Sequence, residues 1–351
     1  MPSVRITSIV LIGACQAYLL SLPLFGPLMN LSGDSVDTYS TTFLVTHLAG
    51  VLLGGWMVDK IERRVLTAKI ASIFLILAVF AFYFGYYILA AIIQGIFLGI
   101  AILTWGSILA RSIKPWDRAR TFAIGATLGN IFLLLIQYTG SNVVMLAALP
   151  LLPVFLLPDI KFQAEEGAGI NKMTFHFALP VMIFYTLGGF MYAVMEPAFR
   201  ESGISTHVLF YIVVILIAGY LYDSFGRKFT SILGLVLLAL SFTVFNKNMF
   251  VSAYLIQSSY GFLDVFSMII WADLSLHGAE GKHYSIGIFA IVSSLLIGYK
   301  VVLWYHLNPF DFQSIALLLL LFAAISIGIV KEPMLSVEEY TKRASKLGDM
   351  K

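Results

Sequence analysis

Charged residues are scarce in this sequence. Asp, Glu, Lys and Arg make up 12% of its 351 residues, about half of the fraction that is usual in soluble domains. Apolar and aromatic residues account for 60% of the chain, and the mean hydropathy is +0.92. This composition excludes a soluble globular protein and is typical of an integral membrane protein.

Cysteine is nearly absent as well. Because Cys15 is the only one, an internal disulfide is excluded. The formal net charge of +3 is too small to indicate a nucleic-acid partner. The first apolar run is long, and no small-residue cleavage site follows it, so we expect it to remain as a helix.

Enzyme motifs are also missing. The sequence contains no His-Glu-x-x-His, no Gly-x-Ser-x-Gly, no phosphate-binding Gly-x-x-x-x-Gly-Lys loop and no pair of intramembrane aspartates suited to proteolysis. We therefore expect a protein that is not an enzyme and that needs neither a cofactor nor a bound metal.

Long apolar runs fill most of the chain. Each is close to the roughly 20 residues that an α-helix needs to cross a bilayer. They predict twelve spans at 6–30, 36–58, 65–85, 87–111, 118–138, 142–158, 173–197, 204–222, 229–246, 249–273, 283–306 and 311–330. The polar segment 159–172 separates the first six from the last six. We expect an N-terminal bundle at 1–158, a cytoplasmic linker at 159–172, a C-terminal bundle at 173–330 and a cytoplasmic tail at 331–351, in which 336–347 could form a short surface helix.

The basic residues indicate the orientation. With both termini in the cytoplasm, nearly all of the 22 Lys and Arg residues fall in cytoplasmic loops, helix ends or tails. Only Arg200 and Lys247 then lie outside, and Lys300 lies within a span. Because cytoplasmic loops carry an excess of positive charge, the sequence predicts a multi-pass protein of the cell membrane with cytoplasmic termini.

The two halves repeat one another. Segment 55–64 reads Gly-Trp-Met-Val-Asp-Lys-Ile-Glu-Arg-Arg, and segment 219–228 reads Gly-Tyr-Leu-Tyr-Asp-Ser-Phe-Gly-Arg-Lys. Both are Gly-x-x-x-Asp followed by a basic pair, each after the second span of its half. A second match links Arg118 to Gly125 with Gly281 to Gly287. The chain is therefore interpreted as a duplicated six-span bundle.

This motif, at this place in a twelve-span chain, resembles the signature of the major facilitator superfamily. The resemblance covers the whole length and implies an all-α membrane protein with twelve transmembrane helices in two pseudo-symmetric six-helix bundles. In that family the loop latches the bundles together in the outward-facing state. The glycine allows a close helix approach, and the aspartate can face a helix N-terminus. The implied latch residues are Gly55, Asp59, Arg63, Arg64, Gly219, Asp223, Arg227 and Lys228.

The sequence departs from the family at three places. Glu62 replaces a glycine of the first motif, and Ala91 stands where an arginine would precede Gln94. Gly125 and Gly129 are not followed by a proline, so the Gly-Pro pattern of drug and proton antiporters is missing. Glu62 adds a carboxylate that could compete within the latch. The missing arginine argues against arginine-assisted proton transfer, and the missing proline lowers the expectation of multidrug efflux without excluding it.

Three ionisable residues lie deep within spans: His47, Asp264 and Lys300. Lipid cannot solvate charge, so each is a candidate functional residue. Asp264 could bind a cation, a proton or a cationic solute, or it could form a structural ion pair with Lys300. Lys300 could instead extend to the membrane surface, and His47 could relay protons or make an interhelical hydrogen bond.

Polar and aromatic residues mark the spans that line the central cavity in this family. They suit a neutral or cationic solute, because amides and phenols combine a few hydrogen bonds with a mostly apolar wall. Packing within the bundles is the alternative for each aromatic residue. Glu196, before Pro197, is either an outer gate or a solvated helix end. These spans contain no buried arginine, which argues against an anionic solute. The candidates are Gln16, Tyr18, Gln94, Trp105, Tyr185, Tyr192, Gln257 and Tyr260.

Together these features predict a secondary transporter, acting as a monomer in the lipid bilayer. It would move a small organic solute by alternating access and couple that movement to a proton gradient or to another ion gradient. The alternatives are an uncoupled facilitator, an exporter of apolar compounds, and a transporter-like sensor or lipid scramblase, since a fold does not fix a function.

Overall fold

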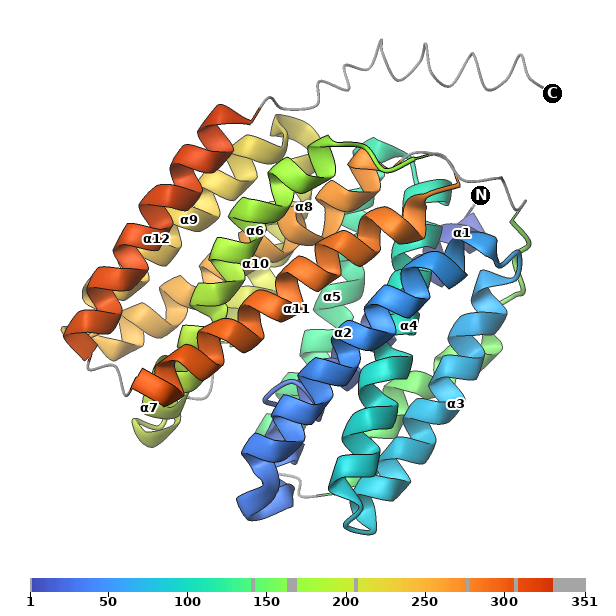
Figure 1. The fold of residues 1–351 in the computed structure, drawn as a ribbon, viewed down its shortest axis with the longest axis horizontal. Coiled ribbons are helices and arrows are strands. Elements are labelled where there is room, and N and C mark those ends of the chain that lie inside the picture. The colour runs from blue at the N-terminus through green and yellow to red at the C-terminus, as the bar shows by residue number, and fades with distance from the viewer. Residues whose placement is uncertain are drawn as a thin grey trace.

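The computed structural model describes residues 2–139, 143–162, 169–204, 208–275, 278–305 and 309–330, and the regular structure within these ranges is entirely helical (Figure 1). The first half contains α1 (Pro2–Ser21), η1 (Pro27–Ser35), α2 (Val36–Lys60), α3 (Arg64–Tyr83), α4 (Tyr87–Ser112), α5 (Pro115–Thr139) and η2 (Val144–Leu156). The second half contains α6 (Met173–Phe190), η3 (Met191–Met195), α7 (Glu196–Glu201), α8 (Val208–Phe225), α9 (Arg227–Val244), α10 (Met249–Leu274), α11 (Glu280–Tyr305) and α12 (Pro309–Ile329).

Eleven helices of the described part are long and apolar enough to cross a membrane. The predicted sixth span is different, because η2 is a 3-10 helix of 13 residues with Pro150 and Pro153 inside it. Proline removes a backbone donor and disfavours a regular α-helix. A 3-10 helix rises about 2 Å per residue, so η2 covers about 26 Å. It thus takes the place of the sixth span with fewer residues, and the predicted all-α fold is confirmed.

Two predicted spans change conformation along their length. The first, expected at 6–30, stops as an α-helix at Ser21. The chain then turns at Phe25, whose φ of 53° is the only positive value for a non-glycine residue in the described part. The seventh passes from α6 into the π-helix η3 and then into α7. Short π-helical segments inside helices often occur at functional sites.

The helices of each half pack mainly on one another. In the first half α2 packs on α4 and α1 on α5, and in the second α11 packs on α6 and α10 on α8 and α9. Across the halves, α2 packs on α11 and α5 packs on α8 (Figure 1). The result is two helix bundles that meet along two equivalent pairs of helices.

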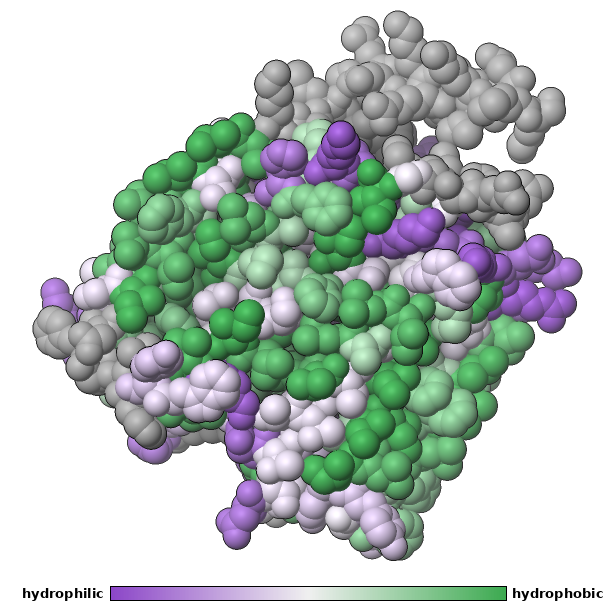
Figure 2. Space-filling view, viewed as in Figure 1, coloured by the Kyte–Doolittle hydropathy of each residue, from purple (hydrophilic) through white to green (hydrophobic). Residues whose placement is uncertain are grey.

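The outer surface is largely apolar. Figure 2 shows a broad hydrophobic area over the sides of the bundles, with hydrophilic residues gathered toward the ends of the helices. Large apolar side chains such as Leu53, Leu135 and Leu321 are more than half exposed there, as expected where lipid rather than water surrounds the protein. Residues 163–168 of the predicted linker and the predicted tail, including 336–347, lie outside the described residues.

Candidate functional site

Asp59, at the end of α2, contacts the first turn of α11 in the other bundle. Its Oδ1 accepts a hydrogen bond of 2.6 Å from the backbone N–H of Gly281, and its Oδ2 accepts one of 3.1 Å from Lys282. These N–H groups have no partner within the helix, and the helix N-terminus carries a partial positive charge. A Cβ on Gly55 would overlap the side chain of Ser285, so the glycine permits this close approach.

Asp223 makes the equivalent contact from the second bundle to the first. Its two oxygens accept hydrogen bonds from the backbone N–H groups of Ala119 (3.2 Å) and Arg120 (3.0 Å), near the start of α5. A Cβ on Gly219 would lie only 2.7 Å from that of Ala123. The repeated Gly-x-x-x-Asp motif therefore joins the bundles twice, at the same end of the molecule. We refer to this end as the latch end.

The basic residues of the two motifs differ in how deeply they are buried. Arg64 is buried, and its Nη2 lies 3.4 Å from Oε2 of Glu280. Arg227 lies 2.9 Å from Oδ2 of Asp273. Arg63 is exposed and lies 3.6 Å from Asp159, and Lys228 is half-buried and donates to the carbonyl of Gly328. Only Arg64 and Arg227 thus contribute to buried ion clusters.

Two buried clusters of arginine and carboxylate complete the latch end. In cluster 1, Glu280 of α11 lies between Arg64 and Arg111 of the first bundle, the latter at 3.6 Å. In cluster 2, Asp273 of α10 lies between Arg227 and Arg118, the latter 3.0 Å away on α5 of the first bundle. Tyr222 also donates to Asp273, at 2.9 Å. Both clusters cross between the bundles.

Sequence analysis missed Glu280, Asp273, Arg111 and Arg118 as a group. The sequence repeat nevertheless relates these residues. Arg111 and Asp273 lie at the ends of the corresponding helices α4 and α10, and Arg118 and Glu280 lie at the starts of the corresponding helices α5 and α11. The charges at these two positions are exchanged between the halves. Each cluster therefore keeps two guanidinium groups and one carboxylate, although the carboxylate comes from a different position.

A cavity of about 630 Å³ lies between the bundles. Helices of both halves line it, and its wall extends from Met268 and Ile288 past Asp264 to Asn30, Gln137 and Ile204. These last residues lie at or beyond the helix ends that are opposite the latch end. We call that side of the molecule the far end. The cavity thus reaches the far end, while the bundles touch at the latch end.

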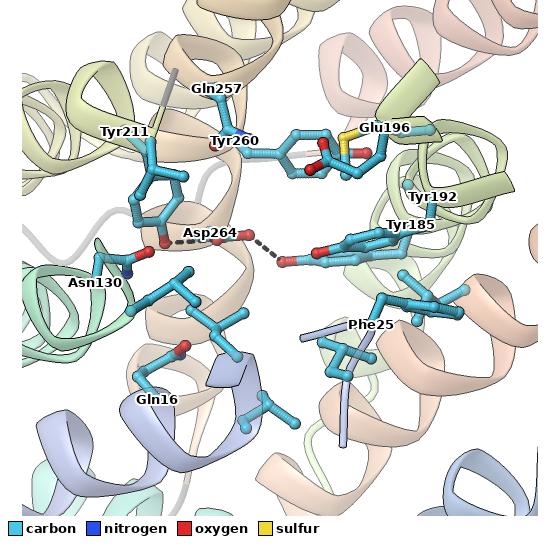
Figure 3. A pocket seen from close by; sticks show the side chains of 18 of the residues that line it. Gln16, Phe25, Asn130, Tyr185, Tyr192, Glu196, Tyr211, Gln257, Tyr260 and Asp264 are labelled. Carbon is cyan, nitrogen blue, oxygen red and sulfur yellow. Dashed lines mark hydrogen bonds between the residues drawn. The ribbon is translucent and has the colours of Figure 1, made fainter. Parts of the chain in front are cut away.

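Asp264 accepts two short hydrogen bonds in the wall of the cavity. Its Oδ1 accepts a hydrogen bond of 2.6 Å from the hydroxyl of Tyr185 on α6, and its Oδ2 accepts one of 2.7 Å from Tyr211 on α8 (Figure 3). The carboxylate on α10 therefore ties three helices of the second bundle together. Tyr211 was not among the predicted residues, although it lies in the predicted span 204–222.

The structure does not contain the ion pair that the sequence allowed between Asp264 and Lys300. Lys300 Nζ lies 2.7 Å from Oδ1 of Asp37, at the far end of α2 in the other bundle. The long lysine stem lets the ammonium reach the surface, as the alternative interpretation had it. Asp264 and Lys300 therefore have separate partners.

His47 lines the cavity from α2. Its Nδ1 lies 3.1 Å from the carbonyl oxygen of Gly95 on α4. Because a carbonyl only accepts, Nδ1 carries the proton, and Nε2 of the neutral ring is left as an acceptor. The interhelical hydrogen bond that the sequence allowed is therefore present, and it fixes the tautomer.

Three other candidates lie in the protein core, away from the cavity lining. Tyr18 donates to the carbonyl of Leu75 at 3.1 Å, Gln94 accepts from Tyr39, and Trp105 packs between Phe122 and Tyr284. Each is essentially inaccessible to solvent. Tyr18 and Trp105 thus pack within the protein, which is the alternative that the sequence left open for aromatic residues, and Gln94 hydrogen-bonds within the first bundle. The candidates that do line the cavity are Gln16, His47, Tyr185, Tyr192, Gln257, Tyr260 and Asp264.

An aromatic contact joins the bundles on one side of the far end. The ring of Phe25 stacks on Tyr192, with 4.7 Å between centroids, and lies 4.8 Å from that of Tyr299. Phe25 and Tyr192 line the cavity, as does Glu196 (Figure 3). Sequence reasoning did not single out Phe25, because its position follows from the unexpected end of α1.

Comparisons with known proteins give structural matches only. No family model and no curated protein matches the sequence. The human organic anion transporter MFSD10 (TETRAN) is similar with a TM-score of 0.75 and 13% identity, covering 93% of this chain and 100% of its own. The major facilitator superfamily proton:xylose symporter XylE, bound to 6-bromo-6-deoxy-D-glucose, gives 0.70 and 14%, covering 94% and 96%.

A bacterial homologue of the iron transporter ferroportin, in the outward-facing state, is similar with a TM-score of 0.68 and 14% identity, covering 93% of this chain and 98% of its own. At such identities the likeness establishes the fold. Together with the repeated motif and the two joined bundles, it shows that this chain has the fold of the major facilitator superfamily.

Proposed function

We propose that the protein is a secondary transporter, which moves a small organic solute by alternating access and exchanges a proton at Asp264 in each cycle. One observation carries this proposal. The Asp59 and Asp223 contacts join the bundles at one end, while the cavity that contains Asp264 reaches the other. A duplicated bundle that is closed at one end only is half of an alternating-access cycle.

The other half of the cycle requires the latch end to open and the far end to close. The contacts that must be broken include the hydrogen bonds of Asp59 and Asp223 and the two ion clusters, beside helix packing such as that of Trp105 on Tyr284. Hydrogen bonds to a charged group contribute about 1.5–3 kcal/mol each, which a solute or a proton can offset. At the far end, the contact of Phe25 with Tyr192 provides a place where closure can begin.

The orientation follows from the charges at the latch end. Arg63, Lys60 and Lys228 lie there on or near the surface, and positive residues favour the cytoplasmic side. We therefore place the latch end and both termini in the cytoplasm. In this orientation the cavity is open to the outside.

Protonation of Asp264 changes how three helices are held. The carboxylate accepts one hydroxyl on each oxygen, from Tyr185 and Tyr211. A protonated carboxyl group carries a donor on one oxygen and is a weaker acceptor than the carboxylate, while a tyrosine hydroxyl can also accept. Loading a proton therefore weakens or reverses one of the two bonds that hold α10 to α6 and α8, in the bundle that contains the π-helix η3.

A second candidate is an uncoupled facilitator. The observation in its favour is that both oxygens of Asp264 already have hydroxyl partners, as expected for a permanent structural tie. In that case Asp264 stays ionised throughout the cycle, and the solute only equilibrates across the membrane.

Reconstitution into liposomes tests the proposal. A thermal-shift screen of solute classes first identifies a ligand of the purified protein, because binding raises apparent stability. We then expect saturable uptake of this solute, with accumulation above equilibrium when a proton gradient is imposed. Asp264→Asn should lose accumulation and keep exchange of the solute across the membrane. Undiminished accumulation by this variant would refute the proton role, and wild-type uptake that never exceeds equilibrium would favour the facilitator.

A further inference from the structure

The described lining of the cavity carries negative charge and no permanent positive charge. Its charged residues are Asp264 and Glu196, and neither lysine nor arginine contributes to it. Both carboxylates lie on the second bundle, and His47 is the only base among the described wall residues of the first bundle. An anionic solute would have no charged partner here.

The tyrosine hydroxyl hydrogens near Asp264 are already used within the protein. Those of Tyr185 and Tyr211 point to Asp264 itself, and that of Tyr260 points to the carbonyl of Phe184 at 3.4 Å. These tyrosines can therefore offer a solute their oxygen lone pairs and ring faces, both of which are electron-rich.

Two polar residues of the first bundle also use donor hydrogens within the protein. His47 uses its Nδ1 hydrogen on the carbonyl of Gly95, which leaves Nε2 as an acceptor. Asn130 uses one amide hydrogen on the carbonyl of Ala126, at 2.9 Å. These two residues thus add acceptors to the wall, beside the amide groups of Gln16, Gln137 and Gln257, which can donate as well as accept.

Electron-rich rings surround the carboxylates. Tyr185 and Tyr260 have centroids 6.3 Å apart at an angle of 57°, and Tyr192 stacks on Phe25 near Glu196 (Figure 3). Cations are attracted to the faces of such rings, most strongly where water is excluded. No group of three or more His, Cys, Asp or Glu side chains that could hold a metal occurs among the described residues, so this chemistry suits an organic cation better than a metal ion.

We infer that the solute is an organic cation, seated against Asp264 and the surrounding tyrosine rings, and that it competes with a proton for that carboxylate. The inference rests on the proposed function and adds the solute class. A cation arriving at protonated Asp264 releases one proton and leaves an ion pair; a returning proton neutralises the carboxylate and frees the cation. The net reaction is exchange of one cation for one proton. This exchange requires only the carboxylate that the cation and the proton share. It does not require the Gly-Pro pattern of drug and proton antiporters, which is missing from α5.

The neighbours of Asp264 allow the proton to be assigned. The wall residues of α4, α5 and α11 are uncharged. The titratable groups that line the cavity around Asp264 are Tyr185 of α6, Tyr192 of η3, Glu196 of α7, Tyr211 of α8, Tyr260 of α10 and His47 of α2. Besides Asp264, Glu196 and His47 are the carboxylate and imidazole groups of this wall, so each is replaced separately in the test below.

Benzyltriethylammonium is a suitable probe because its charge does not change with pH. Isothermal titration with the purified full-length protein should show binding of this cation. The neutral N,N-diethylbenzamide, of similar size, and the anion benzenesulfonate should bind at least about tenfold more weakly. In weakly buffered, mildly acidic solution, binding of the cation should release protons. This release is measured on the wild type and does not depend on the folding of any variant.

The variants identify the carboxylate. Asp264→Asn should weaken binding of the cation by about tenfold or more and abolish proton release, while Glu196→Gln and His47→Gln should retain the release. Asp34→Asn, which removes an exposed carboxylate of η1 outside the cavity lining, should leave both unchanged. A thermal-unfolding measurement identifies any variant that is not folded.

Several outcomes would overturn the inference. Equal binding of the neutral or anionic compound would contradict a cation site, and cation binding without proton release from the wild type would contradict competition. Neither result would affect the proposal of alternating access, which the distance measurements described below test without a ligand. Conversely, cation binding and proton release without transport in liposomes would support this site and refute the proposed function.

Discussion

Asp59 and Gly281 are joined by a hydrogen bond of 2.6 Å from the backbone N–H of Gly281 to the carboxylate, although they belong to different bundles. Asp223 and Arg120 are joined in the same way at 3.0 Å. The two contacts are copies of one another, and the sequence repeat that produces them lies at the end of α2 and of α8. Because the two contacts are equivalent, we expect each of them to contribute equally to the stability of the closed latch end.

Replacing the two aspartates should open the latch end in two additive steps. Asp59→Asn and Asp223→Asn each replace a charged acceptor with a weaker neutral one, and we expect each to raise the open population about tenfold, for a loss of about 1.4 kcal/mol. The measurement is the distance between spin labels at Lys60 and Phe225, which are exposed ends of α2 and α8, in a Cys15→Ala background. Additivity is expected because the sites share no partner. A full effect from one variant and none from the other would refute their equivalence.

Exchanging the charges of cluster 2 should reproduce the charge order of cluster 1. Asp273→Arg alone places three guanidinium groups together, and Arg118→Glu alone leaves two carboxylates beside one arginine. Disrupting a buried pair typically costs about 3–5 kcal/mol, so each single variant should unfold at a clearly lower temperature. The double variant restores two guanidinium groups and one carboxylate, as in cluster 1, and should recover most of the loss. Tryptophan fluorescence during heating measures the transition. A double variant less stable than both single ones would show that the clusters are not interchangeable.

Asp264 and Lys300 should affect stability independently. Their partners are different, Tyr185 and Tyr211 for the first and Asp37 for the second. In a double-mutant cycle with Asp264→Ala and Lys300→Ala, we expect the losses to add within about 0.5 kcal/mol. The cycle of Lys300 with Asp37→Ala should give a coupling of about 0.2–1 kcal/mol, because the Asp37 side chain is 58% exposed. A coupling of several kcal/mol between Asp264 and Lys300 would instead require the two charges to be paired.

Phe25 should stabilise the approach of the bundles at the far end. Phe25→Ala removes contacts with Tyr192 and Tyr299, each worth about 0.5–1.5 kcal/mol for an aromatic pair. We expect a longer distance between spin labels at Tyr86 and Lys247, which are exposed at the far ends of the two bundles. Phe25→Tyr is the matched control, because it retains the ring and should retain the distance. If both variants behave as the wild type, the aromatic contact has no role in closing this end.

The fold could be predicted from the sequence because its main signals are local. Apolar runs predict spans, and the motif at 55–64 repeats at 219–228. The sixth span was the exception, since an apolar run does not distinguish an α-helix from the proline-containing 3-10 helix η2. The early end of α1 was hidden in the same way, because the residues that follow Ser21 remain apolar.

The candidate site was predicted only in part, because the sequence gives the depth of a residue but not the direction of its side chain. Asp264 and Tyr185 face the cavity, whereas Gln94 and Trp105, on a helix that lines the same cavity, are turned into the core. Glu280 could not be paired with Arg64 from sequence, because their contact depends on how the two bundles meet.

The most direct test of alternating access measures both ends of the molecule in the same variant. Asp59→Asn combined with Asp223→Asn is labelled either at Lys60 and Phe225 or at Tyr86 and Lys247, and both distances are determined in lipid nanodiscs by pulsed electron resonance. The account predicts that the latch-end distance becomes longer and the far-end distance shorter, in the same fraction of molecules. A latch end that opens while the far-end distance stays unchanged would contradict it.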